Sequence, residues 1–86
     1  MKFHPDYLNQ LGSNTLIQYS IERGGKIELS VFNLDGRKVK SEDLGFLPPG
    51  RYHHQLNMAG YGSGNYIVEI SLDVMYRDQG VIVLIE

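Results

Sequence analysis

The stretch from Ile27 to Val39 constrains the fold more than any other part of the chain. Its first half alternates apolar with polar residues, and the apolar ones are Ile27, Leu29 and Val31. In an extended chain this period of two places them on one face of a strand. The segment Asn33 to Gly36 follows, where Asn and Asp side chains bond local backbone and glycine accepts a positive φ. We therefore expect a β-hairpin with Asp35 and Gly36 as structural turn residues and one apolar face to be covered.

Composition places the chain among small globular domains. Its 86 residues suffice for one domain, and ten glycines indicate many turns. The formal net charge of −2 argues against a nucleic-acid binder, which would carry a basic patch. No run approaches the roughly 20 apolar residues of a membrane span, so no membrane insertion is expected. The absence of cysteine excludes disulfides and thiolate-ligated metals.

Short strand patterns recur along the rest of the chain at roughly 8–12-residue intervals, and no helical period interrupts them. Residues 1–14 lack either period and are expected to be an irregular lead-in or linker, whereas residues 15–86 form the domain. Further strands are expected at 15–22, 52–57, 65–72 and 81–85. This spacing predicts an all-β fold, an antiparallel β-sandwich of about seven short strands.

Turn residues separate these strands. Gly24-Gly25 is a good signal for a hairpin turn between the first two strands. Pro48-Pro49 predicts a loop over 44–50, because proline cannot join a central ladder. Gly64 closes a glycine-rich turn over 58–64 and is the third predicted structural turn residue. The segment 73–79 is ambiguous and could extend a hairpin around a polar tip.

Few residues suggest metal chemistry. His53 and His54 are adjacent, so on a strand they point to opposite faces and cannot readily share an ion. Zinc needs three or four convergent ligands. We therefore expect no metal and no cofactor, with His54 half-buried and His53 solvated.

Catalytic patterns are also missing. Ser63 lies between two glycines, without the strand–turn–helix context of a nucleophile elbow. Asp35 is expected to cap its own turn. No nucleophile–base pair is visible, and the chain is predicted not to be an enzyme.

The six tyrosines divide by phase. Tyr19, Tyr52 and Tyr66 have the inward phase and are expected to pack in the core, with hydrogen-bonded hydroxyls. Tyr7, Tyr61 and Tyr76 have no clear phase, and if exposed they could form an aromatic row that binds sugar or a partner strand.

The terminal strand is the favoured candidate for partner recognition, and its residues are Val81, Ile82, Val83, Leu84 and Ile85. Its apolar character favours an inner strand covered on both faces. If it is an edge strand, it could add to another sheet and could also join two copies of the chain.

The order of these motifs resembles the type A C-terminal sorting domain of the type IX (Por) secretion system of Bacteroidetes. It also resembles that family's structural cousin, the Ig-like domain of the flagellar hook-capping protein. The resemblance covers about residues 7–85. Its most specific parts are the turn from Asn33 to Val39 and the turn that Ser63, Gly64 and Tyr66 define. His54 stands where members usually carry an aliphatic residue.

The resemblance implies an Ig-like sandwich that serves as a secretion signal. It implies recognition by the outer-membrane translocon and a secreted or cell-surface location reached through the periplasm. The alternative is an Ig-like structural spacer, or a carbohydrate- or protein-binding accessory module of a larger extracellular protein.

Overall fold

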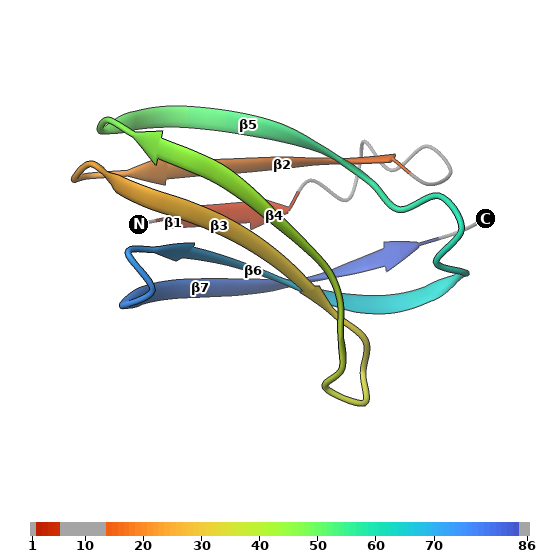
Figure 1. Ribbon diagram of the computed structural model, residues 1–86. Helices are drawn as coiled ribbons and strands as arrows, with labels where there is room; N and C mark the ends of the chain where they lie inside the picture. The colour runs from red at the N-terminus through yellow and green to blue at the C-terminus, as the bar shows by residue number, and fades with distance from the viewer. Residues whose placement is uncertain (1, 6–13, 85–86) are drawn as a thin grey trace.

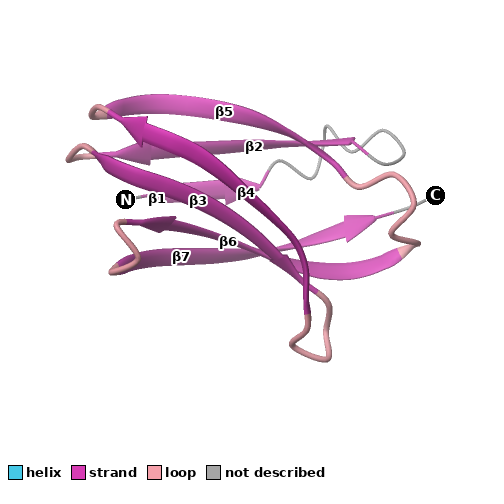
Figure 2. Cartoon of the chain, in the orientation of Figure 1, coloured by secondary structure: helices cyan, strands magenta, loops and turns pink. Residues whose placement is uncertain are grey.

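The computed structural model describes residues 2–5 and 14–84, and strands dominate this part of the chain (Figure 1). The seven strands in it are β1 (Lys2–Pro5), β2 (Asn14–Ile21), β3 (Gly25–Phe32), β4 (Lys38–Leu47), β5 (Gly50–Asn57), β6 (Gly64–Leu72) and β7 (Tyr76–Leu84). Figure 2 shows short turns joining them and no helix among the described residues. In the described ranges, therefore, no helix is long and apolar enough to cross a membrane.

The strands form two antiparallel sheets. One sheet has the order β1-β2-β5, and the other has the order β4-β3-β6-β7. Apolar residues on the inward positions of both sheets make one core, so the predicted Ig-like β-sandwich is confirmed. The core side chains include Ile17 and Ile21 from β2, Leu56 from β5, Ile27, Leu29 and Val31 from β3, and Val68, Ile70 and Ile82 from β6 and β7.

The predicted hairpin around Asn33 and Gly36 is present as β3 and β4. β4 is longer than expected, because it continues to Leu47, into the loop predicted over 44–50. Register irregularities interrupt its pairing with β3 near Ile27 and Phe32. These bulges let the strand twist and keep pairing along its length.

The sequence predicts a hairpin turn at Gly24-Gly25, and this prediction is wrong. β2 and β3 are not a hairpin, because they belong to different sheets. Gly25 is required there for close packing: a Cβ on it would lie 2.5 Å from the Cδ1 atom of Leu72. The glycine pair therefore lies where the chain passes from one sheet to the other.

Pro48 and Pro49 also lie where the chain passes from one sheet to the other. The predicted loop over 44–50 is mostly strand, and only these two residues separate β4 in one sheet from β5 in the other. Proline lacks the amide that a continuous ladder needs, so pairing stops here and the chain changes sheets.

The N-terminal segment contains a strand that the sequence did not predict. β1 pairs antiparallel with β2, from Lys2 opposite Ser20 to Pro5 opposite Ile17. The division into a lead-in over 1–14 and a domain over 15–86 stays a prediction. The remaining positions of that lead-in, 1 and 6–13, lie outside the described residues.

Candidate recognition surface

β7 is an edge strand of the four-stranded sheet, so the favoured expectation of a strand covered on both faces is wrong. Ile82 and Leu84 are buried in the core, whereas Val81 and Val83 are 45% and 41% exposed. Ile85 lies outside the described residues. The side chains of this apolar run therefore alternate between the core and an exposed face. The sequence does not reveal this alternation, because residues on both faces are apolar.

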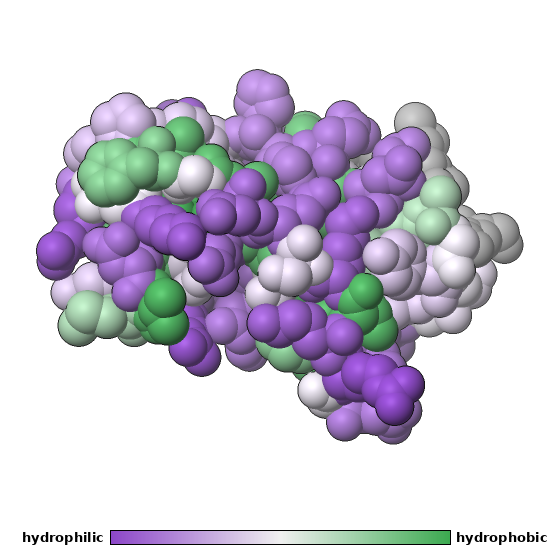
Figure 3. All heavy atoms as spheres, in the orientation of Figure 1, coloured by the Kyte–Doolittle hydropathy of each residue, from purple (hydrophilic) through white to green (hydrophobic). Residues whose placement is uncertain are grey.

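The opposite edge of the same sheet, β4, is protected. Two of its exposed positions, Lys38 and Asp43, carry charges, and the Nζ atom of Lys26 on β3 lies 3.7 Å from a carboxylate oxygen of Asp43. Phe46, near the end of β4, is the apolar exception and is 75% exposed. Gly45 has a φ of +78°, and its amide donates to the Asp43 side chain. Charges and bulges on an edge discourage pairing with another chain. Figure 3 shows hydrophilic residues along much of this side of the molecule.

β7 lacks such protection toward its C-terminal end. Among the described residues it pairs with β6 alone, although β1 also lies against it. In Figure 1 the arrowhead of β7 extends well beyond the end of β1. The Val81–Leu84 part of β7 is therefore the better candidate for pairing with an added strand.

The outer face of this sheet carries an apolar row that the sequence analysis did not single out. Phe32 on β3 is opposite Ile67 on β6, and Ile67 is opposite Val81 on β7. Phe32 and Ile67 are half-buried, and the Lys38 ammonium lies 5.8 Å from the centre of the Phe32 ring. We call Phe32, Ile67 and Val81 the outer apolar row. The sequence does contain a signal for this row. Its three residues are apolar, although each stands at an outward position of its strand, where the alternation predicts a polar residue.

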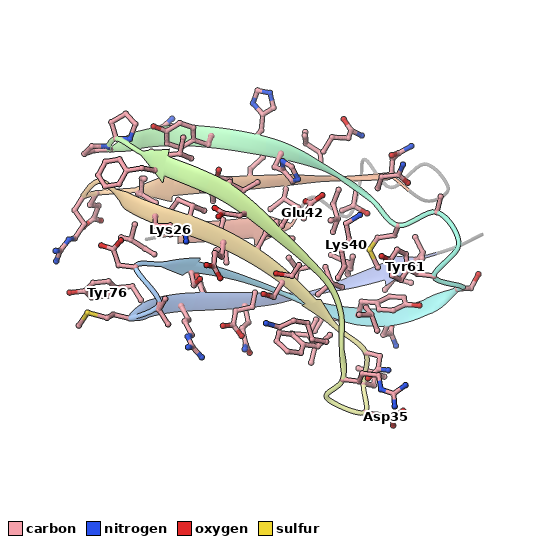
Figure 4. The ribbon with its side chains drawn as sticks, in the orientation of Figure 1. Lys26, Asp35, Lys40, Glu42, Tyr61 and Tyr76 are labelled. Atoms are coloured by element: carbon pink, nitrogen blue, oxygen red, sulfur yellow. The ribbon has the colours of Figure 1, made fainter. Side chains whose placement is uncertain are left out.

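The β3–β4 turn is held by Asn33. The Asn33 Oδ1 atom accepts hydrogen bonds from the amides of Asp35 and Arg37, at 3.0 and 2.9 Å. Gly36 has a φ of +85°, where no neighbour would obstruct a Cβ. The expectation that the Asp35 side chain caps this turn is wrong, since the cap belongs to Asn33 and Asp35 is exposed at the protruding tip (Figure 4).

The glycine-rich turn before β6 is held by Tyr66. The Tyr66 hydroxyl lies 2.6 Å from the carbonyl oxygen of Tyr61 and 2.9 Å from that of Gly62, so it donates back to the preceding turn. Gly64 follows with a φ of +150°, a backbone region that favours glycine. Bonding of a tyrosine near a strand start to upstream backbone resembles the tyrosine corner of Ig-like sandwiches. The motif thus fixes the chain where it enters β6.

The inward tyrosines take the places that their phase predicts. Tyr19 and Tyr66 are buried, and Tyr52 is half-buried with its hydroxyl 2.5 Å from the Pro48 carbonyl oxygen. Tyr19 stacks on Tyr52 with ring centres 5.6 Å apart. Burial, and to a smaller extent the neighbouring Tyr52 phenol, raises the pKa of the Tyr19 hydroxyl above its ordinary value of 10.0.

The exposed tyrosines do not form a row. Tyr61 and Tyr76 are 38% and 43% exposed and lie at opposite ends of the sandwich (Figure 4). Tyr7 lies outside the described residues. A flat aromatic platform for a sugar ring therefore has no counterpart in these two side chains.

His54 belongs to a polar cluster between β4 and β5. Its Nε2 atom lies 2.5 Å from the Glu42 Oε2 atom, and Lys40 Nζ lies 3.8 Å from Glu42 Oε1. The Lys40 ammonium also donates to the Asn57 carbonyl oxygen at 2.9 Å and lies over the Tyr61 ring (Figure 4). These contacts hold together strands from two different sheets, which explains a histidine at an aliphatic position.

His53 faces the other way, toward a shallow hollow of about 470 Å³ on the outer face of the three-stranded sheet. The hollow is lined by Leu16, Gln18, Arg51, Tyr52, His53 and Gln55. Among the described side chains, no three His, Asp or Glu groups gather as a metal site would require. The two histidines thus act on separate faces of β5.

The fold and the surface define the class of protein: a small β-sandwich with an edge strand, β7, beside a partly exposed apolar row. The model of the secretion system C-terminal sorting domain family matches residues 12–83, so the chain belongs to this family. Neither a curated protein nor a solved structure gives a significant match.

The family establishes the function. The domain is a C-terminal sorting signal of the type IX secretion system, a system of Bacteroidetes. Such a signal interacts with the secretion machinery, and the protein that carries it is secreted or displayed on the cell surface. Sorting domains of this family are in general not catalytic.

Proposed function

We propose that the type IX outer-membrane translocon recognises this domain at its terminal strand, Val81 to Ile85, after the protein has reached the periplasm. The observation that carries the proposal is the exposure of Val81 and Val83 on an edge strand. An edge strand presents unpaired backbone groups, and exposed side chains at alternate positions add specificity. The domain acts as a bound signal and performs no catalysis of its own.

The same edge would also allow two copies of the chain to pair. In such a dimer Val81 and Val83 would lie beside the partner strand, and the surface would be closed to the translocon. Sorting therefore requires the strand to be free at the moment of recognition.

A reporter fusion tests the proposal. Residues 1–86 are placed behind a signal peptide and a reporter in a type IX-competent host, and the reporter is measured in the periplasm, on the cell surface and in the medium. We expect most of the reporter outside the outer membrane. A reporter that stays in the periplasm would contradict the proposed function.

A matched pair of substitutions tests the role of the strand. Val83→Lys places a charge on the exposed side of β7, as natural edge strands do to prevent pairing. Gln79→Lys places the same charge on the same strand and the same face, near Glu69. We expect Val83→Lys to retain the reporter in the periplasm and Gln79→Lys to leave export unchanged.

A further inference from the structure

The outer apolar row continues the exposed side of β7 across the sheet. Val81 is 45% exposed, its cross-strand partner Ile67 is half-buried, and Phe32 follows on β3. Val83 lies two residues further along β7 on the same face and is 41% exposed. The apolar surface therefore spans three strands and reaches the edge.

Most of the rest of this outer face is polar, and its exposed apolar exception, Phe46 on β4, is opposite Lys26 toward the other end of the sheet. From the row toward the other end of the sheet, the outward positions carry Ser30, Glu69 and Gln79, and then Glu28, Ser71 and Arg77. Polar contacts join several of them: Gln79 donates to Glu69 at 2.9 Å, and Arg77 lies 3.5 Å from the same carboxylate. Water can hydrogen-bond to these polar side chains, but it offers no such partner to the apolar side chains of the outer apolar row. A continuous apolar row that reaches an edge strand, on a face that is mostly polar elsewhere, is characteristic of an interaction site.

The edge specifies what kind of partner fits. Within residues 2–5 and 14–84, no strand pairs with the outer side of β7, and another strand would supply hydrogen-bond partners for the amides and carbonyls there. An added strand would run about 4.8 Å from β7, and its outward side chains would lie directly beside Val81 and Val83. Apolar side chains at alternate positions of that strand would extend the row by one more residue.

We infer that this chain binds an extended polypeptide strand of the secretion machinery along the C-terminal half of β7, and that Phe32 and Ile67 form part of the binding surface. This inference rests on the proposed function and deepens it. Recognition then depends on residues of β3 and β6 as well as on the terminal strand. The partner strand carries apolar residues at every second position.

The Lys38 ammonium lies at the β3 end of the outer apolar row. It lies 5.8 Å from the centre of the Phe32 ring, and Lys38 is opposite Phe32 in the β3–β4 register. The cation and the ring attract each other and keep the Phe32 side chain on the outer face. The row is thus bounded by a charge at one end and open at the edge strand at the other.

The test uses the reporter fusion with two substitutions that leave β7 unaltered, Phe32→Thr and Ile67→Thr. Threonine is favoured in strands, so each variant keeps the backbone while losing apolar surface. The matched controls are Glu28→Thr on β3 and Ser71→Thr on β6, at outward positions away from the row. Thermal unfolding of the four purified domains identifies any variant that fails to fold.

We expect each row variant to lower the exported fraction of the reporter about tenfold, as the loss of a central apolar contact does in many interfaces, with both controls near wild type. If the wild-type fusion is exported and folded row variants are exported equally well, the inference is overturned while the proposed function stands. If the wild-type fusion stays in the periplasm, the proposed function itself fails.

A second arm distinguishes a partner strand from a second copy of this chain. The purified domain is examined by size-exclusion chromatography with light scattering at about 100 μM, well above the micromolar range of weak pairing. We expect a monomer. A dimer that Ile67→Thr or Val83→Lys dissociates would assign the surface to self-pairing and overturn the inference.

Discussion

The Glu42 carboxylate and the His54 imidazole lie 2.5 Å apart, between strands that belong to different sheets. Glu42 is on β4 and His54 is on β5, and only two prolines separate these strands along the chain. The pair therefore joins the two layers on the side where the chain crosses from one to the other. An aliphatic residue in place of His54 could pack at this position but could not bond Glu42.

Replacing both partners tests whether this contact stabilises the sandwich. We expect His54→Ala and Glu42→Ala each to lower the free energy of unfolding, and the double variant to lose less than the sum. The expected coupling is about 0.5–1 kcal/mol, because both side chains remain partly exposed and solvent screens the contact. Chemical denaturation of the four proteins gives the value. Strict additivity would show that the contact contributes nothing to stability.

The β3–β4 turn offers a contrast between two neighbouring side chains. Asn33→Ala removes the acceptor for two amides, whereas Asp35→Ala alters an exposed side chain at the tip. We expect Asn33→Ala to lower the free energy of unfolding by about 1–2 kcal/mol and Asp35→Ala to change it by less than about 0.5 kcal/mol. Urea unfolding measures both. A larger loss of unfolding free energy for Asp35→Ala than for Asn33→Ala would show that Asp35 caps the turn.

Strain is stored in the turn between β6 and β7. Val74 has a φ of +64° and is 60% exposed, so a β-branched residue holds a left-handed backbone with little burial in return. We expect Val74→Gly to stabilise the domain by about 0.5–1 kcal/mol, since relief of strain outweighs the added freedom of the unfolded chain. Met75→Gly, beside it and 77% exposed, is the control and should not stabilise. Differential scanning calorimetry compares them; a lower melting temperature for Val74→Gly would contradict the reasoning.

Alkaline pH should weaken the fold through Tyr19. Burial, with a smaller contribution from Tyr52, raises the pKa of Tyr19 above 10.0, so the folded state holds this proton more tightly than the unfolded state. The resulting stability is fully present below pH 10 and is lost as the pH rises through the folded-state pKa. We expect Tyr19→Phe to reduce this alkaline loss. Unfolding free energies at pH 8 and pH 11 provide the comparison, and equal losses in the two proteins would refute the role of Tyr19.

Local patterns in the sequence were sufficient for strands and their faces. The alternation at Ile27, Leu29 and Val31 predicted the buried face of β3, and the phase of Tyr66 predicted its burial. Such periods depend only on backbone geometry and the separation of apolar from polar side chains. They survive in any sheet arrangement, which is why they can be found before the arrangement is known.

The pairing of strands was harder, since it depends on contacts between distant residues. Gly24-Gly25 fits a hairpin turn by local chemistry, yet Gly25 is there to pass close to Leu72, 47 positions along the chain. The terminal strand was expected to be covered because Val81 and Val83 are apolar, and only the position of β7 at a sheet edge reveals their exposure. The outer apolar row was missed for the same reason: Phe32, Ile67 and Val81 become neighbours only through register.

The most direct measurement of the central claim compares the reporter fusion in two strains of one Bacteroidetes host, with and without an intact type IX translocon. The reporter carried by residues 1–86 should reach the cell surface or medium in the intact strain and accumulate in the periplasm of the other. An equal distribution in both strains would contradict the account of this domain as a type IX sorting signal.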